Sequence, residues 1–204
     1  MRPAGGDDEA LLELIPHTVA RLREADPGAH WAYRREAYGF ELRFHCGARA
    51  ARRLGLSVAP VATGDGPAHP QLSTIASDLA LALARRGEPS ADTALPMAVR
   101  HLRTTAGLIA PGERRPFLFE CWRYWSAGLG SGVRLKLMAL AEQPVPEPCA
   151  DDSWTEYHRA LAGLGEVTGP MKYTLFRLAD GTLNRLGVPR ADQALAALVV
   201  RRLP

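Results

Sequence analysis

The stretch "WAYRREAYGFELRFHCG", from Trp31 to Gly47, decides the fold class of this chain. Aromatic and branched residues lie on both sides of a polar centre that contains Gly39, which is typical of a β-hairpin. We therefore predict two antiparallel strands, Trp31–Arg35 and Phe40–Cys46.

The second of these strands has two different faces, because successive side chains of a strand point to opposite sides. The apolar face carries Phe40, Leu42 and Phe44. The polar face carries Glu41, Arg43 and His45. Three ionisable groups are thus expected on one surface of the sheet.

Outside the hairpin, most of the chain has apolar residues at helical spacing. This pattern predicts helices over residues 7–23, 72–86, 94–108, 152–164, 171–186 and 190–203. The stretch "RRPFLFECWRYW" (114–125) reads as a further strand, and "VRLKLMAL" (133–140) fits a strand or a helix. Residues 59–70 and "EQPVPEP" (142–148) are rich in proline and are expected to be a loop and a linker.

These elements predict an α+β fold, in which an antiparallel sheet is packed against several helices. Residues 1–8 are expected to be a flexible tail and residues 9–204 a single domain, which suits the chain length of 204. We expect helices on one side of the sheet and a peptide-accessible surface on the other.

Composition argues against several function classes. The three cysteines form no paired motif and the six histidines are scattered, so no metal site is expected. The net charge of +3 comes from dispersed arginines, which does not favour nucleic-acid binding. No apolar run approaches the roughly 20 residues that span a bilayer, and no signal peptide is apparent, so a cytoplasmic protein without membrane contact is expected.

The helix over 171–186 carries an unusual polar stripe. Its members fall at steps of four, three and four residues: Tyr173, Arg177, Asp180 and Asn184. Gly181 inside the same helix costs about 1 kcal/mol relative to alanine, which indicates close packing or the approach of another group. The stripe alone favours a solvated face. For Asn184-Arg185 a second interpretation is equally open, namely a tie between the helix end and the sheet.

The C-terminal stretch "LADGTLNRLGVPRADQALAALVVRRL" (178–203) resembles the end of the thiopeptide-type bacteriocin biosynthesis domain. That domain also forms the C-terminal elimination part of class I lantibiotic dehydratases. Three further stretches resemble it in the family's order: 31–47, "FECWRY" (119–124) and "CADDSWTEYHRAL" (149–161). Together they cover nearly the whole chain.

The chain departs from the elimination enzymes of this family at several points. Their Arg-x-Arg on the second strand is Glu41-Leu42-Arg43 here, and their histidine before Asn-Arg is replaced by the segment 180–182, Asp-Gly-Thr. The paired glycines expected after Tyr124 are missing, and we expect this protein to have no glutamylation domain. The resemblance is therefore greatest to the stand-alone pyridine synthases.

This resemblance implies maturation of a ribosomally synthesised precursor peptide, a leader plus a dehydrated core, with a dehydratase as a possible protein partner. A pyridine synthase joins two dehydroalanines by a formal [4+2] cycloaddition and releases water and the leader peptide, which closes a macrocycle. It needs no cofactor. Two alternatives stay open: a glutamate-elimination subunit of a split dehydratase, and a non-catalytic module that binds the leader peptide.

On this hypothesis Arg43 stabilises charge on an amide oxygen, and Glu41, His45 or Tyr33 moves protons. Asn184 and Tyr173 would orient the peptide. The other candidates for substrate binding are Arg185, Asp180 and Arg123. The alternative for Glu41 and Arg43 is a surface ion pair, and for Glu120 and Arg123 a structural ion pair is preferred.

Overall fold

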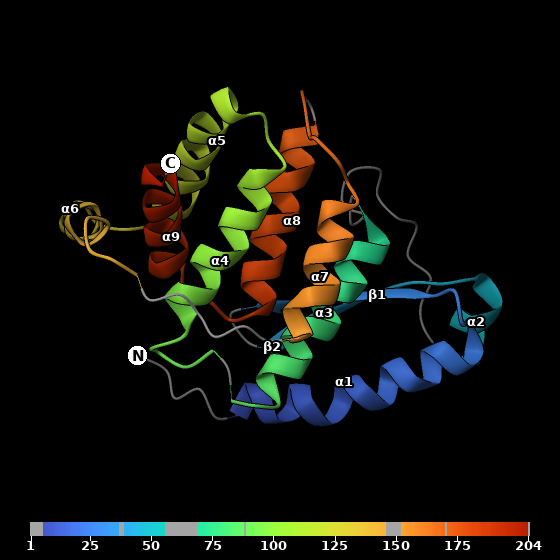
Figure 1. The fold of residues 1–204 in the computed structure, drawn as a ribbon. Coiled ribbons are helices and arrows are strands. Elements are labelled where there is room, and N and C mark those ends of the chain that lie inside the picture. Colours follow the sequence, from blue (N-terminus) through green and yellow to red (C-terminus); the bar gives the residue numbers. More distant parts are fainter. Residues whose placement is uncertain are drawn as a thin grey trace.

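The computed structural model describes residues 6–36, 39–55, 69–87, 89–145, 152–169 and 171–203. Within these ranges two strands and nine helices follow one another along the chain (Figure 1). They are α1 (Gly6–Ala25), β1 (His30–Glu36), β2 (Gly39–His45), α2 (Ala48–Arg53), α3 (Pro70–Ala84), α4 (Ala94–Gly107), α5 (Pro111–Ser126), α6 (Ser131–Leu140), α7 (Asp152–Ala162), α8 (Met171–Arg185) and α9 (Arg190–Arg202). The expected single-domain α+β fold is confirmed.

The predicted hairpin is present, with strand ends within one residue of the expected ones. β1 pairs antiparallel with β2, and Gly39 has φ +112°, a region that favours glycine. The register pairs Trp31 with Phe44, Tyr33 with Leu42 and Arg35 with Phe40. Directly paired side chains share a face. Trp31 and Tyr33 therefore lie on the apolar face of β2, which packs against the core.

Helices form most of the core. α3 packs against β1, α7 and α8, while α9 packs against α5 and α4. Every residue of α9 from Gln193 to Val200 is buried, as expected for a helix that is covered on all sides. In Figure 1 the helices α4, α8, α7 and α3 stand side by side, and the hairpin and α1 cross their lower ends.

The predicted strand over 114–125 is wrong, because these residues form most of α5. Its buried apolar side chains are Phe117, Leu118, Cys121 and Trp125, whereas Phe119 and Tyr124 are exposed. This spacing is that of one helix face, with Pro111 in the first turn. The aromatic content of the segment favoured a strand, but strand propensity is weak compared with tertiary packing.

The other ambiguous segment, 133–140, is helical and belongs to α6. The described residues therefore hold only the two-stranded hairpin, smaller than the sheet expected from sequence. α1 begins at Gly6, so residues 6–8 are helical rather than part of the expected tail. The expected loop over 59–70 lies outside the described residues up to position 68, as does the linker from 146 onward.

The remaining predicted helices agree with α1, α3, α4, α7, α8 and α9 to within a few residues. No helix in the described ranges combines the length and apolarity needed to cross a membrane. The same ranges contain no group of three His, Cys, Asp or Glu side chains that could hold a metal ion.

Candidate functional site

The outer edge of β1 is closed by side chains from two helices. The backbone N–H of Trp31 donates to Thr74 Oγ1 (2.9 Å), and this hydroxyl donates back to the Trp31 carbonyl (3.0 Å). The Arg35 N–H donates to Asn184 Oδ1 (2.8 Å), and Asn184 Nδ2 donates to the Arg35 carbonyl (3.1 Å). The amide of Asn184 thus takes the place of a peptide group in a third strand.

Arg185 continues this closure. Its Nε donates to the Tyr33 carbonyl (2.9 Å), while the Tyr33 hydroxyl and Arg35 Nε donate to the Arg185 carbonyl (2.9 and 3.0 Å). Asn184 and Arg185 therefore tie the end of α8 to the sheet, which confirms the second of the two interpretations given above. Tyr33 is only 1% exposed on the apolar face, opposite to Glu41 and Arg43. The structure does not bring Tyr33 together with them.

Gly181 makes room for the buried guanidinium of Arg185. A Cβ at position 181 would lie 3.3 Å from Arg185 Nη1, closer than most side-chain contacts, so a larger residue would require the guanidinium to shift by a few tenths of an ångström. Among the described residues Arg185 Nη1 has no hydrogen-bond partner, and no carboxylate pairs with this guanidinium. Burial lowers the pKa of Arg185 to about 10.

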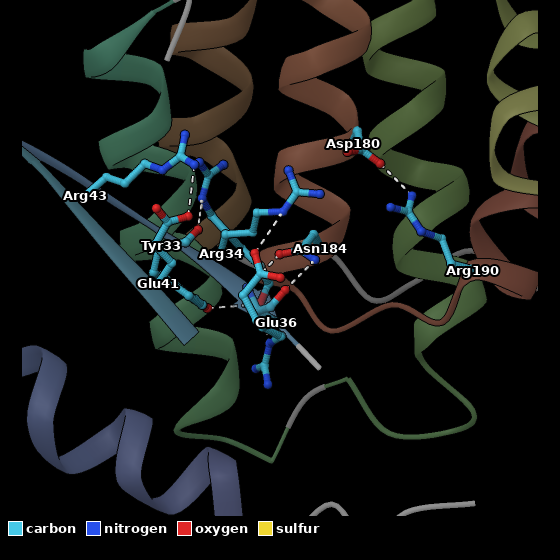
Figure 2. A network of polar contacts seen from close by, with 10 residues as sticks. Tyr33, Arg34, Glu36, Glu41, Arg43, Asp180, Asn184 and Arg190 are labelled. Atoms are coloured by element: carbon cyan, nitrogen blue, oxygen red, sulfur yellow. Dashed lines mark hydrogen bonds and ion pairs between the residues drawn. The ribbon is translucent and has the colours of Figure 1, made fainter. Parts of the chain in front are cut away.

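Two further arginines stand near Arg185. The positive charges of Arg34 and Arg43 lower its pKa further, after the opposing effect of Tyr157 and Tyr33. Their side chains belong to the outer, polar face of the hairpin (Figure 2). We call Arg34, Arg43 and Arg185 the arginine cluster.

Two carboxylates on the same face partly balance this cluster. Arg43 Nη2 lies 2.9 Å from Glu41 Oε2, and Arg34 Nε lies 3.4 Å from Glu36 Oε1. The ion pair of Glu41 and Arg43 that sequence left open is therefore present, with both side chains about 45% exposed. Three cations against two carboxylates leave the described part of this face positive.

His45 occupies the other end of the same face. It pairs with His30 across the strands, with ring centroids 6.4 Å apart. The predicted grouping of Glu41, Arg43 and His45 on one face of β2 is confirmed, since these three are more exposed than Phe40, Leu42 and Phe44 between them.

The polar stripe predicted on α8 is not one surface. Asp180 is buried and accepts hydrogen bonds from Trp125 Nε1 (2.9 Å) and Arg190 Nη1 (2.6 Å). Tyr173 is 64% exposed and accepts from Arg177 at 3.4 Å. Tyr173 precedes Asn184 by about 16 Å along the helix, at 1.5 Å per residue. Neither Asp180 nor Tyr173 joins the arginine cluster.

Arg123 is also absent from this cluster. It lies on α5, which packs against α9 and α4, and its Nε donates to Glu120 at 2.9 Å. The predicted ion pair of Glu120 and Arg123 is therefore present, and both of its side chains are exposed.

Sequence reasoning missed Arg34 as a member of the charged face. The register places it directly opposite Glu41. Counting outward from the turn at Gly39 would have given this pairing, because hairpin register fixes which residues share a face.

The outer edge of β2 contrasts with that of β1. The backbone N–H and C=O groups of Trp31 and Arg35 point away from β2, toward α3 and α8. In an antiparallel ladder the paired residues, Phe44 and Phe40, then point their backbone groups away from β1. These outward groups of β2 form no backbone–backbone hydrogen bond with any residue that the structure describes. Such an edge is suited to pairing with another extended chain.

No protein-family model, curated protein or solved structure matches this chain.

Proposed function

We propose that this protein matures a ribosomally made precursor peptide, as a pyridine synthase that joins two dehydroalanines by a formal [4+2] cycloaddition. The observation that carries the proposal is the arginine cluster. A buried guanidinium without a carboxylate partner among the described residues stands beside two more exposed ones, in a hairpin whose β2 edge forms no backbone hydrogen bond with any other described segment. Fixed positive charge of this kind favours a substrate oxygen that becomes negative.

An extended peptide can add to the outer edge of β2 as a third strand. Backbone hydrogen bonds would supply affinity, and the side chains on the polar face would supply selectivity. The short helix α2 follows directly and exposes Arg49, Arg52 and Arg53. This positive surface favours a peptide with an acidic segment, such as an acidic leader.

The chemistry needs orientation and proton transfer. Two alkenes must meet while one amide takes its iminol form, after which two carbon–carbon bonds form and water and then the leader amide depart. Holding both alkenes in one peptide conformation removes much of the entropic barrier. Arg43 would contact the amide oxygen, and Arg185 beneath it would add a fixed charge.

Proton transfer would fall to Glu41 and His45, which share the face of Arg43. Tyr33 and Asn184 hold β1 to α8 and are not proposed to act on the peptide. We also propose no role in orienting the peptide for Tyr173, Asp180 and Arg123, because none of the three lies in the arginine cluster.

Glutamate elimination is a second candidate, because the arginine cluster could also hold a departing carboxylate. That reaction requires a base near the segment 180–182. The carboxylate there, Asp180, is bound by Trp125 and Arg190. Asp180 is therefore not available as that base, and we place elimination second.

Mass spectrometry separates these functions. Incubation with a leader peptide whose core contains dehydroalanines should give a core product that lacks the leader and one water. Formation of dehydroalanine from a glutamylated serine peptide would replace the proposal by elimination. Binding of both peptides without any change in mass would leave a non-catalytic leader-binding module and overturn the proposed reaction.

A further inference from the structure

Helix α6 stands at the edge of the molecule, where it packs mainly against α9 (Figure 1). Leu137 is the only buried side chain among its ten residues. A helix of this length has little stability of its own, so it depends on the burial of apolar side chains. One leucine contributes little burial, and the other sides of α6 therefore need an explanation.

The remaining large apolar side chains of α6 are exposed. They are Val133, Leu135, Met138 and Leu140, of which Leu135 is the most exposed at 67%. Single exposed apolar residues are common on protein surfaces, whereas four of them on one short helix form a patch. Patches of this kind mark sites of interaction with another molecule.

The apolar residues of α6 lie on two sides of the helix, because successive residues are about 100° apart around its axis. One side carries the buried Leu137 and faces α9. The side turned away from it carries Leu135, Met138 and Ala139, which are all exposed. We call these three residues the outer face of α6. Methionine adapts its shape easily, which suits a surface that meets a partner.

Cations border this outer face on both sides. Arg134 lies one turn before Met138, and Lys136 lies one turn before Ala139. Neither cation forms an ion pair with a residue that the structure describes. α6 contains no acidic residue, and the next carboxylate along the chain, Glu142, is held by a cation of α9 at 3.2 Å. The outer face is therefore an apolar strip between two positive charges.

These charges decide which kind of partner fits the outer face. A second copy of the same helix would bring cations next to cations, which disfavours self-association. A membrane surface is also a poor fit, since α6 has no Trp or Phe, the aromatic residues that membrane-surface helices place on their apolar side. A helix with an apolar stripe between acidic residues complements both the strip and its charges.

We propose that the outer face of α6 binds an amphipathic helix of a partner protein, whose apolar stripe is bordered by glutamate or aspartate. Leu135 and Met138 would contact the stripe, and Arg134 and Lys136 would pair with carboxylates on its two sides. Exposed pairs of this kind select the partner more than they strengthen its binding. This inference goes beyond the proposed peptide chemistry and does not rest on it.

Fluorescence anisotropy of the whole chain with two dye-labelled helical peptides tests this pairing. The acidic probe has about three heptads, with leucine at the two apolar positions of each heptad and glutamate at the positions beside them. The basic probe has lysine in place of every glutamate. We expect saturable binding of the acidic probe and at least about tenfold weaker binding of the basic probe, because its lysines would face Arg134 and Lys136.

Two substitutions locate the contact on α6. Leu135→Gln removes the most exposed apolar side chain and should weaken binding of the acidic probe about tenfold. Lys136→Glu should weaken binding of the acidic probe and strengthen binding of the basic probe, each by about threefold or more. The matched controls Leu14→Gln and Arg21→Glu make the same changes at exposed positions of α1, which packs against α2, α3 and β2. They should leave the binding of both probes unchanged.

Several results would overturn the inference. Absence of saturable binding of the acidic probe, equal binding of both probes, or equal losses in the α6 and α1 variants would each exclude the proposed site. A dimer in sedimentation velocity that Leu135→Gln abolishes would assign the outer face to a second copy. Binding to vesicles of phosphatidylserine and phosphatidylcholine that Leu135→Gln abolishes would assign it to a membrane surface.

The four substituted side chains are exposed, and circular dichroism of each variant separates a loss of binding from a loss of fold. Lys136→Glu carries the decision, because a gain in binding of the basic probe cannot result from unfolding. If this variant binds the basic probe no better than the parent chain does, the charges of α6 do not select the partner and the inference is wrong.

Discussion

Helix α8 carries polar residues in both of its halves, but the two halves differ in burial and in the partners of their side chains. At its N-terminal end Tyr173 and Arg177 are exposed and contact each other. At its C-terminal end Asp180 and Arg185 are buried, and Asn184 replaces a strand partner for β1. Polar residues at helical spacing can therefore mark a water-facing side in one turn and a buried junction in the next.

Among substitutions in α8, the largest loss of folding stability is expected at Asp180. In Asp180→Ala, the buried Trp125 N–H loses its acceptor and Arg190 loses its ion pair. We expect the free energy of unfolding to fall by about 3 kcal/mol. Urea denaturation measures this. Asp180→Asn, which keeps an acceptor for Trp125, should lose less, and a loss below about 1 kcal/mol in the alanine variant would contradict the role assigned to Asp180.

Asn184→Ala should have the next largest effect. It removes two hydrogen bonds and leaves the N–H and carbonyl of Arg35 without partners at a half-buried edge. We expect a loss of about 2 kcal/mol in urea denaturation. Hydrogen exchange at the Arg35 amide should accelerate at the same time. Unchanged exchange at this amide would mean that Asn184 does not close the edge of β1.

The packing of α4 against this half of α8 predicts a pH dependence through His101. Burial, and then the charge of His158, lower the pKa of His101 to about 3, and a backbone contact with Ala179 on α8 opposes this only in part. Below about pH 6.5 the unfolded chain takes up a proton that the folded chain does not. Folding stability therefore decreases as the pH falls toward 3, by at most about 1.4 kcal/mol per pH unit.

His101→Leu removes this titration and keeps an apolar side chain of similar size at the buried position. We expect a shallower decrease of stability between pH 6.5 and 4 than in the parent chain, measured by urea denaturation at each pH. Parallel curves for the two proteins would show that His101 gains a proton in the folded state and would contradict its burial as a neutral group.

The smallest effects belong to the N-terminal half of α8. Tyr173→Ala and Arg177→Ala should each change the free energy of unfolding by less than about 0.5 kcal/mol, because both side chains are exposed. They serve as matched controls for Asp180 and Asn184 on the same helix. Losses as large as those at Asn184 would remove the distinction between the two halves.

The hairpin was predictable because its pattern is local. Alternation from Phe40 to His45 gave both faces of β2, and the turn at Gly39 fixed the register. Most helices were predictable for the same reason, since apolar spacing and breaking residues lie within each segment.

The arginine cluster was only partly predictable. Arg43 and Glu41 follow from the alternation, but the approach of Arg185 depends on how α8 meets β1. Gly181 correctly indicated the close approach of another group. That group is the guanidinium of Arg185, four residues further along the same helix. The error over residues 114–125 has a related cause, because the segment packs against α9 rather than into a sheet, and only Phe117 and Trp125 of its aromatic side chains are buried.

The proposed function depends most on the positive charge at the outer face of the hairpin. Turnover of a dehydroalanine-containing precursor by Arg43→Gln, followed by mass spectrometry, tests this most directly. Since Arg43 and Glu41 form an exposed pair, the variant should keep its stability within about 1 kcal/mol and lose product formation by about 100-fold or more. Turnover equal to that of the parent chain would contradict the proposed function of this site.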